Sequence, residues 1–219
     1  MKYIFLLFSI SIFSQNLKTP FENGNGNQST TYEECIAFYE KLDESFANIQ
    51  MIHKGTIDSG KPLHLVLFSS EGKFDFDEYF TKNKAVILIN NGIHAGEPDG
   101  IDATMMLMRD LAMGKIKTAK NTLIAAIPVY SVGGMLNRNS HSRANQNGPE
   151  EYGFRGNARN YDLNRDFIKS DTKNSRSFQK LFTELNPDIF LDNHVSNGAD
   201  YQYTFTCIAT QHERLGNKL

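Results

Sequence analysis

Apolar side chains follow two kinds of pattern along the chain, and together these patterns predict alternating helices and strands. Spacings of three and four residues predict helices over 30–47, 102–113 and 172–185. Short apolar runs bounded by turn residues predict strands over 49–57, 63–69, 85–91, 121–130, 188–193 and 201–209. A further helix is expected to begin at residue 211. This alternation predicts an α/β fold with a mixed, largely parallel central sheet flanked by helices.

Two of the predicted elements carry more detailed expectations. The runs at 85–91 and 121–130 lack polar alternation, which is typical of strands covered on both faces. For the helix over 102–113, the spacing predicts four residues facing the core: Ala103, Met106, Leu107 and Leu111.

The first residues have the pattern of an export signal. Lys2 gives a basic start, an apolar run follows over 3–13, and the sequence then becomes polar. A membrane span needs about 20 apolar residues, more than this run contains. We therefore predict a signal peptide over 1–15, a polar linker over 16–30, and one domain over 31–219. The predicted location is the periplasm or the extracellular space.

Composition and charge exclude some classes of function but do not identify one. The formal charge of −2 excludes a nucleic-acid binder that depends on bulk positive charge. The two cysteines, Cys35 and Cys207, are too few for a disulfide scaffold, and the sequence leaves their redox state open.

Three residues that commonly bind metals follow two of the predicted strands. His94 and Glu97 come just after the buried run at 85–91, and His194 follows the run at 188–193. A histidine and a glutamate three apart are usually only a solvated pair. Strand ends at the same edge of a sheet converge, however, so all three side chains are expected to meet. Two imidazoles and one carboxylate form an open zinc site with room for water.

A long polar stretch over 131–165 separates these candidates, and such loops are usually functional. It carries Arg155, Arg159 and Arg165, whose guanidinium groups can bind carboxylates with two hydrogen bonds. The alternative is a solvated basic loop. Asp162 in the same stretch could orient a metal-binding histidine through a hydrogen bond. The remaining histidines, which receive no role, are His53, His64, His141 and His212.

The order of these segments resembles the zinc carboxypeptidase family (the funnelins), in particular its bacterial secreted branch. The matching phrases are His94-x-x-Glu97, then Asp162-Leu163-Asn164-Arg165, then His194, and the resemblance runs from about Tyr32 to the end. It implies one Zn²⁺ per chain and removal of C-terminal amino acids from peptides by metal-activated water. It also implies that 31–219 is part of a catalytic domain.

The resemblance also assigns roles to individual residues. His94, Glu97 and His194 would hold zinc, while Asn164 and Arg165 would bind the carboxylate of the substrate's C-terminus. Arg155, nine residues before Asn164, matches the arginine that polarises the scissile carbonyl, and Arg159 is a poorer match. The implied partner is a peptide with a free C-terminal carboxylate, with no nucleic acid and no membrane span.

Two departures from the family pattern leave alternatives open. The stretch 131–139 lacks the Asn-Pro-Asp-Gly phrase that the family often carries, so the outer substrate pocket is unpredicted. The family's general-base glutamate lies far beyond the last zinc ligand, and Asp200 and Glu213 come too early to match it. We therefore expect a C-terminally truncated fragment and assign the base to no residue. The alternatives are a zinc amidase acting on acyl-amino acids or cell-wall peptides, and a pseudoenzyme that binds zinc and carboxylates.

Overall fold

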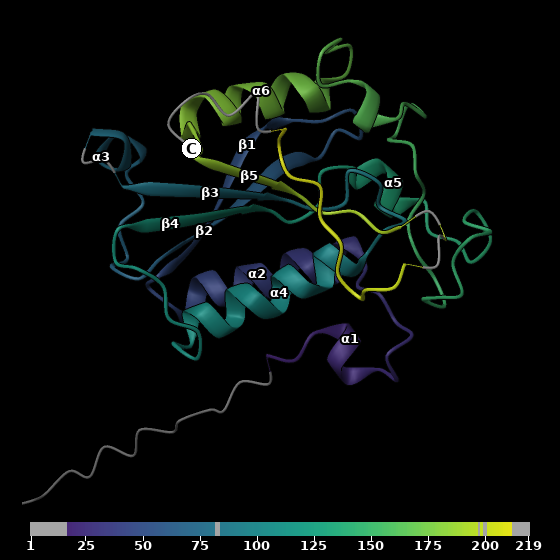
Figure 1. Ribbon diagram of the computed structural model, residues 1–219, viewed down its shortest axis with the longest axis horizontal. Helices are drawn as coiled ribbons and strands as arrows, with labels where there is room; N and C mark the ends of the chain where they lie inside the picture. The colour runs from purple at the N-terminus through teal and green to yellow at the C-terminus, as the bar shows by residue number, and fades with distance from the viewer. Residues whose placement is uncertain (1–16, 82–83, 197, 199–200, 212–219) are drawn as a thin grey trace, which may run out of the picture.

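A mixed β-sheet forms the centre of the computed structural model, which describes residues 17–81, 84–196, 198 and 201–211 (Figure 1). The described strands pair in the order β1-β2-β4-β3-β5. They are β1 Ile49–Thr56, β2 Pro62–Ser69, β3 Ala85–Asn90, β4 Thr122–Ile127 and β5 Ile189–Asp192. The β1–β2 and β2–β4 pairs are antiparallel, whereas β4–β3 and β3–β5 are parallel. The predicted α/β fold with a mixed sheet is thereby confirmed.

Helices cover both faces of this sheet. α2 Tyr32–Ser45 and α4 Asp99–Ala112 lie on one face, and α6 Lys173–Leu185 lies on the other (Figure 1). α2 begins with a capping box formed by Thr31 and Glu34. Short helical segments that the sequence pattern did not predict are α1 Pro20–Asn23, α3 Phe76–Thr81, α5 Val132–Leu136 and a 3₁₀ turn over Leu163–Arg165.

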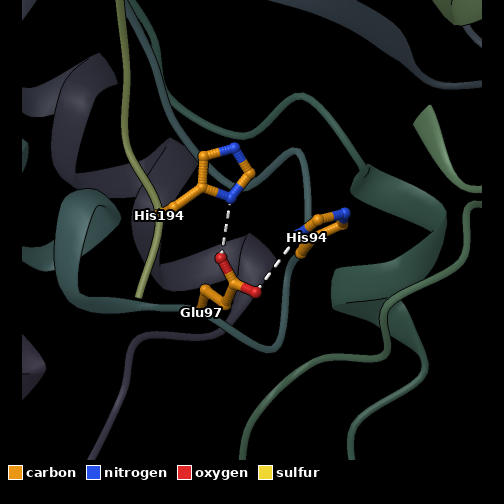
Figure 2. Close-up of side chains that lie close together, drawn as sticks. All are labelled: His94, Glu97 and His194. Carbon is orange, nitrogen blue, oxygen red and sulfur yellow. Dashed lines mark hydrogen bonds and ion pairs between the residues drawn. The ribbon is translucent and has the colours of Figure 1, made fainter. Parts of the chain in front are cut away.

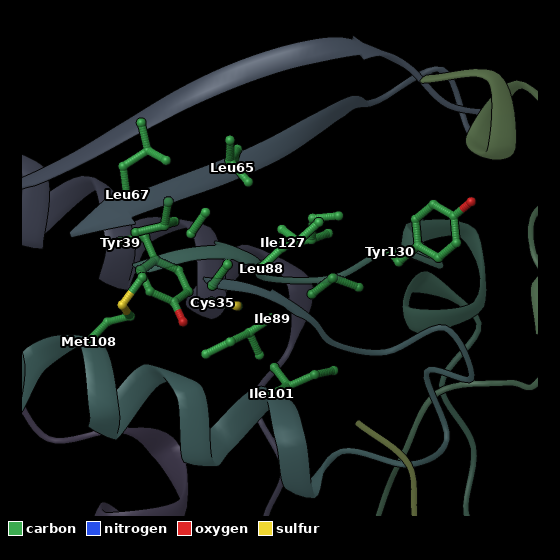
Figure 3. Packing of buried hydrophobic residues seen from close by; sticks show 14 of the residues in the cluster. Cys35, Tyr39, Leu65, Leu67, Leu88, Ile89, Ile101, Met108, Ile127 and Tyr130 are labelled. Atoms are coloured by element: carbon green, nitrogen blue, oxygen red, sulfur yellow. The ribbon is translucent and has the colours of Figure 1, made fainter. Parts of the chain in front are cut away.

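The core lies on both faces of the sheet. α2 and α4 pack on one face, and Phe178, Leu181 and Leu185 of α6 pack on the other. β2 and β4 are buried along most of their length (Figure 3). The predicted inner face of α4 is partly wrong, because Ala103 is exposed and Met106 and Leu107 are only half-buried. Asp102 and Arg109 occupy inner positions instead. Polar partners make this possible: Arg109 Nη1 donates to the carbonyl of Leu17, and the backbone N–H of Thr30 donates to Asp102. Apolar spacing alone misses these pairs.

The described part of the segment expected to be a linker packs against the domain. Leu17 joins the core cluster, and α1 carries its own capping box formed by Thr19 and Glu22. Arg138 donates hydrogen bonds to the backbone carbonyls of Ser29 and Thr30.

The predicted strand over 201–209 is wrong. Residues 201–211 pair with no strand among the described residues, and their side chains are exposed. An extended segment becomes a strand only when a neighbour accepts its backbone hydrogen bonds. The predicted signal peptide over 1–15 and nearly all of the helix expected from 211 lie outside the described residues. Within the described part of the chain, no helix is long and apolar enough to cross a membrane.

Candidate metal centre

Parallel pairing brings two chain segments to the same edge of the sheet. β3 and β5 run side by side with Asn90 opposite Asp192, so the residues that follow each strand leave in the same direction. The backbone N–H of Asn193 donates to the carbonyl of Asn90 over 3.0 Å, which extends the pairing beyond β5. The loop over 91–98 and the segment over 193–195 therefore lie next to each other.

Side-chain amides hold these two segments in place. Asn90 Nδ2 donates to Asp192 Oδ1 over 2.9 Å, and Asn193 Nδ2 donates to Asn91 Oδ1 over 2.8 Å. Gly100, in the first turn of α4, lies so close that a Cβ there would be 2.5 Å from the Cβ of Asn193. Only glycine allows the helix to approach this closely.

The three predicted metal ligands come together at this edge. One ligand atom from each of His94, Glu97 and His194 lies within 4.8 Å of the other two. Figure 2 shows Glu97 between the two imidazoles: His94 Nδ1 lies 3.2 Å from Oε1, and His194 Nδ1 lies 2.9 Å from Oε2. The side chains of His94 and Glu97 are 3% and 2% exposed, whereas that of His194 is 33% exposed.

Both imidazoles have the same arrangement of partners. Each turns Nδ1 toward Glu97 and Nε2 toward an aspartate: His94 Nε2 lies 3.0 Å from Asp162 Oδ1, and His194 Nε2 lies 3.2 Å from Asp192 Oδ2. A metal-binding histidine typically uses its second nitrogen in this way, which fixes the ring orientation. Asp162 was predicted from the sequence, whereas Asp192 was not. The spacing of Asp192 and His194 could have indicated this contact, because residues two apart in an extended segment point to the same side.

Two further donors contact the Glu97 carboxylate. The backbone N–H of Val195 donates to Oε2 over 3.1 Å, and Arg143 Nη2 donates to Oε1 over 2.8 Å. Arg143 comes from the polar loop and carries no feature that distinguishes it in the sequence from its neighbouring arginines.

Charge interactions shift the pKa values of the cluster in opposite directions. Hydrogen bonds with Asp192 and Glu97 raise the pKa of His194 to about 9, against the opposing effect of burial. Burial raises the pKa of Glu97, but its hydrogen bonds with His194 and His94 outweigh burial and leave that pKa well below its usual range. For Asp162, burial is likewise outweighed by hydrogen bonds with His94 and Arg155, which lower its pKa. Without metal, Glu97 and Asp162 are therefore ionised at neutral pH beside a protonated His194.

The predicted arginines take different positions. Arg155 donates from Nε and Nη2 to Asp162 Oδ2 over 3.1 and 2.9 Å, so Asp162 contacts both this guanidinium and His94. Arg165 is exposed and donates to the carbonyl of Asn164, whose backbone N–H donates to Asp162. Arg159 instead lies over the ring of Tyr161, 4.9 Å from its centroid.

The histidines without a predicted role lie away from the cluster or outside the described residues. His53 and His64 pack edge to face on β1 and β2, with ring centroids 4.7 Å apart. His141 is exposed, and His212 is outside the described residues. Cys35 is buried and Cys207 is exposed, and the two are unpaired.

A family model described as zinc carboxypeptidase matches residues 35–200. The chain belongs to the zinc carboxypeptidase family. A donor set of two imidazoles and one carboxylate fits the metal that gives this family its name.

The chain is also similar to individual carboxypeptidases, each at low sequence identity. Carboxypeptidase 2 of Trichophyton rubrum is 27% identical over 117 residues, covering 52% of this chain and 19% of the relative. A metallo-carboxypeptidase from Burkholderia cenocepacia has a TM-score of 0.57 at 15% identity, over 79% of this chain and 43% of that one. Carboxypeptidase A from Helicoverpa armigera has a TM-score of 0.54 at 16% identity, over 77% and 46%. The chain thus spans less than half the length of these relatives.

Proposed function

We propose that this chain carries the metal-binding part of a zinc-dependent carboxypeptidase that removes C-terminal amino acids from peptides. The observation that supports this proposal best is the shared arrangement of His94 and His194. Each turns Nδ1 toward Glu97 and Nε2 toward an aspartate. His94, Glu97 and His194 would hold one Zn²⁺. When bound, zinc lowers the pKa of its water to about 7 and acts as a Lewis acid on a carbonyl.

The chain's own residues would orient the site and the substrate. Asp162 accepts hydrogen bonds from Arg155 on one oxygen and contacts His94 with the other, so it couples the orientation of this guanidinium to that of a metal ligand. Arg155 is half-exposed, which leaves it accessible to a substrate carbonyl. We assign it the role of stabilising negative charge on that oxygen.

Substrate anchoring is assigned to Asn164 and Arg165. Asp162 fixes the start of their 3₁₀ turn by accepting the backbone N–H of Asn164. The exposed guanidinium of Arg165 can form paired hydrogen bonds with a carboxylate. A peptide with a free C-terminus supplies that carboxylate. We propose that the protein is exported and acts on such peptides in the periplasm or extracellular space.

A second candidate is a protein that binds zinc and carboxylates without turnover. The observation in its favour is that Asp162 and Asp192, the other carboxylates in contact with the ligand histidines, are already engaged in positioning them. Both oxygens of each aspartate already have a hydrogen-bond partner in the protein. The general base therefore remains unassigned.

Incubation of the zinc-loaded full-length gene product with an N-acylated dipeptide tests the first proposal. We expect release of the C-terminal amino acid, no release from the matching C-terminal amide, and no release by His194→Ala. Zinc binding at one ion per chain without any release would favour the second candidate. Equal cleavage of acid and amide would remove the proposed carboxylate anchor.

A further inference from the structure

Arg143 is a buried cation in direct contact with a proposed zinc ligand. Its side chain is 7% exposed, and its Nη2 lies 2.8 Å from Oε1 of Glu97, which is 2% exposed. The family phrases found in the sequence do not include this arginine.

The surroundings of Arg143 are built to hold it in this position. Its backbone N–H donates to Tyr152 Oη over 3.2 Å, and its Nε donates to Gln146 Oε1. Gly96, next to Glu97, makes room for the arginine, because a Cβ there would lie 2.6 Å from both Arg143 Cδ and the carbonyl oxygen of Gly153. Glycine at position 96 therefore leaves the space that the Arg143 side chain occupies beside Glu97.

Glu97 receives two kinds of donor. His94 and His194 are proposed metal ligands, so the Nδ1 atom that each turns toward Glu97 would bind the metal and could not also donate to the carboxylate. The guanidinium of Arg143 and the backbone N–H of Val195 do not lose their protons at physiological pH. Each oxygen of Glu97 thus keeps one permanent donor: Arg143 on Oε1 and Val195 on Oε2.

We propose that Arg143 is a positioning residue that fixes the Glu97 carboxylate for zinc. This inference rests on the zinc site proposed above. Arg143 differs in role from Arg155, whose side chain is 41% exposed and faces a possible substrate. Burial keeps Arg143 away from substrate, so it acts on the metal through Glu97. Hydrogen-bond partners of metal ligands typically contribute about 10- to 100-fold to metal affinity.

Zinc affinity of the folded chain, measured by competition with a chromophoric chelator, tests this role. We expect Arg143→Gln to weaken zinc binding about 10- to 100-fold. Arg143→Lys keeps the charge but loses the planar group, and we expect a smaller loss. The d–d absorption of the Co²⁺-substituted chain should shift in both variants, because the orientation of a metal ligand changes.

Arg138→Gln is the matched control. Arg138 lies in the same loop and donates to the carbonyls of Thr30 and Glu151 over 2.9 and 3.0 Å, so its loss should lower thermal stability. Because it does not hold Glu97, zinc affinity and the Co²⁺ spectrum should stay unchanged.

The outcomes separate the two proposals. A wild-type chain that binds no zinc overturns both. A wild-type chain that binds zinc, together with Arg143 variants that bind it equally well, overturns the role of Arg143 alone. If Arg143→Gln does not fold, Arg143→Lys decides: weaker zinc binding than in Arg138→Gln supports the role, and equal binding overturns it.

Discussion

The two halves of the metal centre are built differently. His94 and Glu97 follow β3, a strand that pairs with β4 on one side and β5 on the other, and both side chains are buried. His194 follows β5, a four-residue strand that pairs with β3, and its side chain is one-third exposed. Both halves nevertheless bring an imidazole to the same carboxylate.

This difference shows how a site can combine a rigid part with a more weakly supported one. The first half follows a buried strand, whereas the second follows a partly exposed strand and depends more on polar contacts. Those contacts join Asn193 to Asn91 and the N–H of Val195 to Glu97. We therefore expect the first half to keep its form without metal, and the second half to gain most from metal binding.

Removing either imidazole should have the largest effect on metal binding. We expect His94→Ala and His194→Ala each to abolish zinc retention after dialysis, a loss greater than the ~100-fold attributed to partners of metal ligands. The variants should differ in their metal-free stability. His94→Ala removes a buried imidazole that contacts two carboxylates and should lower the free energy of unfolding by about 1.5–3 kcal/mol. His194→Ala should lower it by less, because this side chain is one-third exposed and solvent screens its ion pairs. Equal losses of stability would contradict the comparison.

A matched pair of leucines tests the same contrast in the strands. Leu88 on β3 is 0% exposed, whereas Leu191 on β5 is 44% exposed. We expect Leu88→Ala to lower the free energy of unfolding by about 2–5 kcal/mol. Leu191→Ala should lower it by less than about 1 kcal/mol, because a partly exposed side chain leaves little cavity. Urea unfolding of both variants measures the difference, and similar midpoints would show that β5 is as well packed as β3.

Zinc binding should release a proton from the exposed half. The pKa of His194 is raised to about 9 in the metal-free chain, so the imidazole is protonated at pH 7 and must lose that proton to coordinate. Between pH 8 and 6, zinc affinity should fall about tenfold per unit as pH falls. Calorimetry in two buffers of different ionisation enthalpy counts the protons released, and a count of zero would contradict this.

Without metal, the same group gives the opposite pH dependence. Because its folded pKa lies above the ordinary value of 6.5, protonated His194 stabilises the fold at low pH. That contribution is lost as pH rises through about 9.

The smallest effect is expected at the proposed substrate anchor. Arg165→Ala should weaken binding of an N-acyl amino acid about tenfold. This is the lower end of the about 1.5–3 kcal/mol that a hydrogen bond to a charged group contributes, because Arg165 is exposed. Binding of the matching amide should barely change. Arg159→Ala is the control, because Arg159 is exposed and lies over Tyr161. Equal effects on acid and amide would remove the proposed role of Arg165.

The sequence was sufficient to predict the fold class, because strands such as 85–91 and 121–130 are buried apolar runs. It also placed His94, Glu97 and His194 near each other, since each follows a strand of one sheet. It could not identify Arg143, whose role depends on a contact across the fold. The inner face of α4 was misassigned for a related reason: Asp102 and Arg109 are buried through partners far away in the sequence.

We propose that His94, Glu97 and His194 hold one zinc ion, with a position left open for water. Zinc K-edge X-ray absorption of the dialysed, zinc-loaded chain tests it most directly. We expect one zinc per chain, with nitrogen and oxygen neighbours at about 2.0–2.2 Å. Sulfur neighbours at about 2.3 Å, or a spectrum unchanged in His194→Ala, would contradict it.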